Sequence, residues 1–86
     1  MTDLESAFAQ AARDVHALPV RPDNSTLLQL YALYKQGSEG DVSGPEPGFF
    51  DFVGTAKYKA WAELAGTPRN EARQRYVDLV VRLQQG

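Results

Sequence analysis

The sequence predicts an all-α protein of four helices, and three features of the chain indicate this. Apolar residues recur at helical spacing in four segments, glycines and prolines separate these segments, and strand-like alternation is absent. The short apolar run at 49–53 is the one strand candidate, and it lies too close to Gly and Pro residues to extend. With 86 residues the chain is long enough for a single domain, 1–86, that buries a modest core.

The first predicted helix starts at Asp3, because Thr2 and Glu5 have the spacing of a capping box. Prolines at positions 19 and 22 end it, since each disfavours helical geometry in the residue before it. Its apolar face consists of Phe8, Ala11, Ala12 and Val15.

The second helix is predicted at 24–37, with a choice of N-cap residues at 23–25 and Gly37 as the first helix breaker. It is apolar around most of its circumference, so we expect it to be packed on more than one side. The stretch 37–51 is rich in Gly and Pro and is predicted to be irregular. A loop of this length in a compact domain is more often functional or an ordered crossover than idle.

The third helix is predicted at 52–65, capped by Asp51 and stopped by Gly66. Thr67 and Pro68 then have the form of an N-cap followed by a first-turn proline, which predicts the start of the fourth helix. The apolar stripe of that helix comprises Tyr76, Val77, Val80 and Leu83. Its exposed face carries the i,i+4 pairs Glu71–Arg75 and Asp78–Arg82.

The composition excludes several classes of function. There is no cysteine for a thiolate zinc site or thiol catalysis, and the single histidine, His16, cannot build a metal site alone. The net charge of −2 argues against nucleic-acid binding, which needs a broad basic surface. No membrane-spanning or signal segment is evident. We therefore expect a cytoplasmic, monomeric, non-enzymatic protein without a metal or cofactor.

The candidate binding residues are Tyr31, Tyr34 and Lys35, whose spacing places them along one helical face. An ammonium group beside phenols suits a phosphate, and an aromatic face suits a stacked base. Alternatively, these tyrosines are half-buried core residues. Lys57 supplies a second cation, and neither it nor Lys35 has an acidic partner in the predicted helices, whereas Lys59 has Glu63.

The chain resembles the acyl-CoA-binding protein family along nearly its whole length. The resemblance rests on dispersed motifs, namely Tyr31-Ala32-Leu33-Tyr34-Lys35-Gln36, Gly40-Asp41, Pro47-Gly48, Asp51-Phe52, Ala56-Lys57, Ala60-Trp61 and Gly66-Thr67. It implies a four-helix bundle with up-down-down-up connectivity. It also implies a carrier that binds medium- to long-chain fatty acyl-CoA without catalysis and makes at most transient contact with acyl-CoA-using enzymes.

The resemblance also implies a role for each candidate site residue. Tyr31, Lys35 and Lys57 would hold the 3′-phosphate of the adenosine moiety. Tyr34 and Tyr76 would lie against the adenine and the neighbouring ligand surface. Leu28, together with Leu27, would line the groove for the acyl tail. His16 stands where the family usually has a lysine that reaches towards phosphate.

Val53 and Thr55 also replace lysines that are common in the family, and Tyr58 replaces a tryptophan. We therefore expect weaker and less salt-sensitive attraction of phosphate than in a lysine-rich relative. The alternative hypothesis is a helical protein-interaction module that keeps the scaffold and has lost the ligand.

Overall fold

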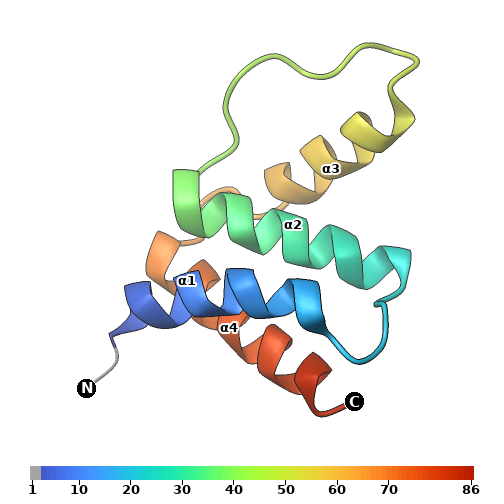
Figure 1. The fold of residues 1–86 in the computed structure, drawn as a ribbon. Helices are drawn as coiled ribbons and strands as arrows, with labels where there is room; N and C mark the ends of the chain where they lie inside the picture. Colours follow the sequence, from blue (N-terminus) through green and yellow to red (C-terminus); the bar gives the residue numbers. More distant parts are fainter. Residues whose placement is uncertain (1–2) are drawn as a thin grey trace.

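A computed structural model describes residues 3–86. Its elements are α1 (Leu4–Asp14), the short 3₁₀ helix η1 (Val15–Ala17), α2 (Asn24–Glu39), α3 (Phe52–Ala62) and α4 (Arg69–Gln84), with no strand among these residues. The α-helices run up-down-down-up, as predicted (Figure 1). The 49–53 strand candidate is instead a turn at 49–50 that leads into α3.

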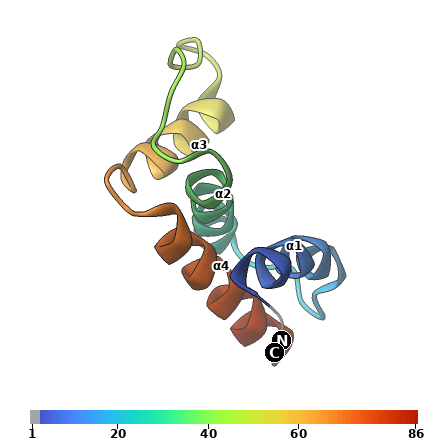
Figure 2. The ribbon, with the colours of Figure 1, turned by 90° about the vertical axis from the view of Figure 1, so that its left-hand side faces the viewer.

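The helix α2 is the centre of the molecule. It packs against both α3 and α4, while α1 packs against α4. The view along α2 shows α3 and α4 on different sides of it, with α1 beside the lower part of α4 (Figure 2). The prediction that α2 is packed on more than one side is thus confirmed, and its apolar circumference is explained by having two helical neighbours.

Aspartates cap the first three α-helices. The side chains of Asp3, Asp23 and Asp51 accept hydrogen bonds from the backbone N–H three residues on, at 2.7, 2.8 and 2.9 Å respectively. Each bond satisfies a donor that the helix itself leaves free. The predicted cap Asp51 is confirmed, and the predicted helix start at Asp3 becomes the cap that precedes Leu4. Thr2, half of the predicted capping box, lies outside the described residues.

The predicted end of α2 at Gly37 is wrong, because the helix continues through Gly37 to Glu39. Gly37 is a packing position: a Cβ there would lie 2.9 Å from Cγ of Arg73 and 3.1 Å from Cζ of Phe8. The helix ends at Gly40, whose φ of +83° is a conformation that favours glycine. The irregular connection therefore begins three residues later than predicted.

The third helix ends at Ala62, before the predicted 65. The N–H groups of Leu64 and Ala65 bond to carbonyls three residues back, so the chain tightens into successive turns before Gly66, where φ is +89°. These tight turns continue the apolar pattern beyond the α-helix proper, which explains the overestimate.

The predicted N-cap of the fourth helix, Thr67, is also wrong by one residue. Pro68 occupies the cap position with ψ at 143°, and its carbonyl accepts the first helical hydrogen bond from Ala72. The Thr67 carbonyl instead accepts from the side chain of Gln36 on α2. A tertiary contact thus uses the residue that the local pattern assigned to capping.

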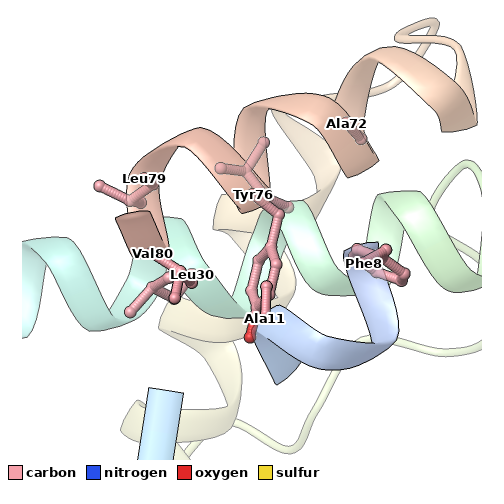
Figure 3. Close-up of a cluster of buried hydrophobic side chains, with 8 residues drawn as sticks. Phe8, Ala11, Leu30, Ala72, Tyr76, Leu79 and Val80 are labelled. Atoms are coloured by element: carbon pink, nitrogen blue, oxygen red, sulfur yellow. The ribbon is translucent and has the colours of Figure 1, made fainter. Parts of the chain in front are cut away.

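The core lies between α1, α2 and α4. Tyr76 reaches from α4 towards α1, with its ring beside Ala11 (Figure 3). The buried cluster consists of Phe8, Ala11, Leu30, Leu33, Ala72, Tyr76, Leu79 and Val80. Partly buried Ala12, Val15, Val77 and Leu83 pack against it. The apolar stripes predicted for the first and fourth helices therefore meet each other.

Candidate functional site

Where α2 packs against α3, each helix contributes one lysine and one aromatic ring, and each lysine lies over the ring of the other helix. The Lys57 ammonium of α3 lies 5.2 Å from the ring centroid of Tyr31 on α2. In the reverse sense, the Lys35 ammonium of α2 lies 4.8 Å from the ring of Trp61 on α3. Both distances suit cation–π attraction. We call these four residues the lysine–aromatic site.

Trp61 forms the floor of this site and ties it to the end of α2. It is 5% exposed, and its indole Nε1 donates a 2.8 Å hydrogen bond to the carbonyl of Gly40. A buried indole N–H needs such an acceptor. The Gly40 carbonyl, at the C-terminal end of α2, therefore holds the Trp61 ring in place beneath Lys35.

The prediction that Lys35 has no acidic partner is wrong. Its ammonium forms an ion pair with Glu39, one helical turn further along α2. The hydrogen bond to this carboxylate raises the pKa of Lys35 above its ordinary value. The error follows from the misplaced end of α2, which left Glu39 in the loop. Lys57, by contrast, has no carboxylate oxygen within 4.0 Å among residues 3–86.

The predicted exposed pairs form only in part. Glu71 and Arg75 lie 3.9 Å apart, as predicted. Asp78 instead accepts a 2.9 Å hydrogen bond from Gln74, its neighbour one turn earlier. Within the described part of the chain, the Asp78–Arg82 and Lys59–Glu63 pairs do not come within 4.0 Å. Exposed ion pairs of this kind contribute little to the free energy of folding, so a charged side chain readily takes a different partner.

A hollow of about 390 Å³ adjoins the lysine–aromatic site through Tyr31. It brings together five of the predicted site residues, since its lining is Ala12, Val15, His16, Leu27, Leu30, Tyr31, Tyr34 and Tyr76. His16 reaches it from η1, just beyond the end of α1. The lining is mainly apolar and aromatic, which suits a planar or aliphatic group with few polar contacts.

An aromatic stack supports this hollow. The rings of Phe8 and Tyr34 are stacked at 5.3 Å, and Tyr76 meets Phe8 edge-on at 5.3 Å and Tyr34 at 5.8 Å. Tyr76 is 3% exposed, and burial raises the pKa of its phenol. Tyr34 is 41% exposed. Tyr34 thus offers an accessible ring, while Tyr76 belongs chiefly to the core behind it.

Leu28 is placed apart from the other predicted site residues. It lines a second hollow, of about 750 Å³, between α2, α3 and α4, whose lining does not include Tyr31. The apolar part of that lining also includes Ala32, Leu33, Ala56, Ala60, Leu64 and Leu79. Of the two neighbours predicted to shelter an acyl tail, Leu27 is the one that shares the hollow with Tyr31.

Gln36 has a structural role that the sequence reasoning missed. Its side chain is fully buried, and its Nε2 donates to Asp41 Oδ1 and to the Thr67 carbonyl, both at 2.8 Å. The same Asp41 oxygen accepts from the Gly66 N–H at 2.9 Å. Gln36 therefore joins the end of α2 to the connection between α3 and α4. The position of Gln36 in an otherwise apolar helix is the sequence signal that indicates a buried, hydrogen-bonded side chain.

Chemically, the site offers ammonium groups for a phosphate and aromatic faces for a planar ring. Among residues 3–86, no three His, Cys, Asp or Glu side chains are grouped to hold a metal ion. The helices described for these residues are too short or too polar to cross a membrane.

Comparison with known proteins relates this chain to one family. Residues 5–80 match the family described as "Acyl CoA binding protein". The chain is 46% identical over 77 residues to "Acyl-CoA-binding protein homolog 1" of Caenorhabditis elegans, covering 90% of each chain. The crystal structure of Oryza sativa Acyl-CoA-Binding Protein 2 superposes with a TM-score of 0.91 at 32% identity, covering 96% of this chain and 92% of that one.

A second kind of relative is much longer. "Enoyl-CoA delta isomerase 2" of Rattus norvegicus is 48% identical over 80 residues, which are 93% of this chain and 20% of the isomerase. The chain thus spans about a fifth of the length of that relative. In both kinds of relative the similarity extends over nearly all of the present sequence. With a family match over 5–80 and a whole-length relative at 46% identity, the chain belongs to the acyl-CoA-binding protein family.

Proposed function

We propose that residues 1–86 form one unit that binds medium- to long-chain fatty acyl-CoA thioesters and carries them without chemical change. Membership of the family supports this, as do the names of its relatives. The observation that carries the proposal is the alternation of Lys35 and Lys57 with aromatic rings across the α2–α3 seam. Charge and stacking at one place suit a phosphorylated nucleoside.

In this proposal the ligand is divided between polar and apolar contacts. Lys35, Lys57 and the Tyr31 phenol bind the 3′-phosphate of the adenosine, through charge-assisted hydrogen bonds. The exposed ring of Tyr34 stacks with the adenine, an interaction that contributes about 1–3 kcal/mol. Tyr76 supports that ring from the core and borders the same hollow. His16 lies at its edge.

The acyl tail is the apolar part of the ligand. Each methylene removed from water contributes about 0.8 kcal/mol, so chain length adjusts affinity. Leu27 lines the hollow that contains Tyr31 and Tyr34, and Leu28 lines the second hollow between α2, α3 and α4. Both leucines lie near the start of α2. We propose that the tail lies along this end of α2.

Calorimetric titration tests the binding proposal. Palmitoyl-CoA is expected to bind tightly, and free palmitate, which lacks the nucleotide, is expected to bind far more weakly or not at all. Equal binding of the two would contradict a site built around the phosphates. Absence of heat with either would overturn the function and favour a protein-interaction role for this scaffold.

The absence of catalysis is tested separately. Since some relatives are named enoyl-CoA isomerases, an enoyl-CoA and palmitoyl-CoA are each incubated with the protein and analysed by chromatography. Both are expected to be recovered unchanged, and isomer or free CoA formed above the protein-free control would contradict a carrier role. We propose a monomeric, cytoplasmic protein that meets acyl-CoA-using enzymes only transiently; size-exclusion chromatography at several concentrations tests the monomer.

A further inference from the structure

Glu39 occupies a position where a carboxylate does little for its own helix. It is the last residue of α2, where exposed carbonyl groups favour cations over anions. The order of the pair, lysine first and glutamate four residues later, is also the less favourable one for an α-helix. The helix therefore does not require this charge, and the ion pair with Lys35 is its only ionic contact among residues 3–86.

The ion pair leaves the two site lysines unequal. The Lys35 side chain is 24% exposed and its charge is offset by Glu39, whereas Lys57 has no carboxylate partner in the described range. The Glu39 side chain is 51% exposed, so it is free to move into solvent. A phosphate that approaches Lys35 meets a carboxylate of the same sign on the same ammonium group.

We propose that Glu39 competes with the 3′-phosphate of the bound CoA for the Lys35 ammonium, and so lowers the affinity of the site for its ligand. The inference rests on the proposed function. Lys57 is available to the phosphate at once, while Lys35 contributes only after it exchanges Glu39 for the phosphate. Glu39 is thus a positioning residue that holds Lys35 over Trp61 in the free protein and weakens retention of the ligand.

The test compares Glu39→Gln with the unaltered protein by calorimetric titration at low ionic strength. Palmitoyl-CoA is expected to bind about two- to fivefold more tightly to the variant, which is the range for loss of one exposed ion pair. Palmitoyl-3′-dephospho-CoA is expected to bind both proteins equally. Unchanged affinity for palmitoyl-CoA, or an equal gain for both ligands, would overturn the inference.

Two further variants separate competition from a general charge effect. Glu71→Gln removes the same charge from the Glu71–Arg75 pair on α4 and is expected to leave the affinity unchanged. In a Lys35→Met background, Glu39→Gln is expected to give no gain, because the group for which the carboxylate competes is absent. A gain that persists there would mean that Glu39 acts directly on the ligand, against this inference. No binding by any of these proteins, the unaltered one included, would overturn the proposed function itself.

Discussion

The ammonium of Lys57 lies 5.2 Å above the ring of Tyr31, so that a cation of α3 is seated on an aromatic face of α2. The contact spans two helices that run in the same direction and are joined by the long connection 40–51 (Figure 1). Its counterpart, Lys35 over Trp61, spans the same seam in the reverse sense. Because each helix contributes one cation and one ring, the site depends on the packing of α2 against α3 and on neither helix alone.

Substitution of Lys57 is expected to weaken ligand binding. Lys57→Met keeps the apolar stem but removes the charge, and should lower the affinity for palmitoyl-CoA by about 1.5–3 kcal/mol, as for a charged hydrogen bond. Lys35→Met should cost less, because Lys35 must first leave Glu39. Calorimetry measures both. Lys59→Met is the matched control, since Lys59 lines the other hollow, and a loss there as large as at Lys57 would contradict the placement of the phosphate.

Added lysines at the start of α3 are expected to strengthen binding at low salt. Val53 is 67% exposed and stands one helical turn before Lys57, so Val53→Lys adds a cation near the Lys57 ammonium, and Thr55→Lys adds a second cation to the first turn of α3. The gain should shrink as salt rises, because exposed charges are screened. A salt titration of palmitoyl-CoA affinity measures it. If the variant gains no affinity at low salt, Val53 and Thr55 are not the cause of weak phosphate attraction.

Loss of Gln36 is expected to destabilise the fold. Gln36→Ala removes hydrogen bonds to Asp41 and Thr67 in a fully buried place and should lower the free energy of unfolding by about 1–3 kcal/mol. Gln10→Ala is the control, because its hydrogen bond to Asp14 is exposed and its effect should stay within about 0.5 kcal/mol. Urea denaturation measures both. Equal effects would contradict a structural role for Gln36.

Stability is expected to fall in acid. Hydrogen bonds from the Gly66 N–H and the Gln36 amide hold the pKa of Asp41 below its ordinary value of 3.8, and backbone donors lower the pKa of Asp3 and Asp23 likewise. Since the folded-state pKa is the lower one, this stabilisation is complete above the unfolded value. It is lost as pH falls from there through the folded values.

Thermal unfolding measured from pH 7 down to pH 2 checks this direction. Asp41→Asn keeps an oxygen acceptor and removes the titrating charge, so its melting temperature should depend less steeply on pH below 3.8. An unchanged acid slope would mean that Asp41 does not contribute to it.

The amino-acid sequence determined much of this protein by local chemistry. Helical periodicity predicted four helices, the Asp51 side chain predicted a cap, and apolar spacing predicted the stripes of the first and fourth helices that carry Phe8 and Tyr76. These features depend on residues close together in the chain, or on apolar helix faces that must be buried against another element. For the same reason, Tyr31 and Lys35 are predicted to share one helical face, whereas the position of Lys57 over Tyr31 depends on the packing of α3 against α2.

The tertiary structure decided which of the possible residues ends α2 and which begins α4. The helix α2 continues through Gly37, where Phe8 and Arg73 occupy the space that a side chain would need, and this extension lets Glu39 pair with Lys35. Pro68 takes the cap position of α4, and the Thr67 carbonyl accepts a hydrogen bond from Gln36 of α2. Local sequence signals specify which residues can end a helix. Contacts from distant segments decide which of these residues ends the helix. They can do so because their energies are similar to those of a helix cap or an exposed ion pair.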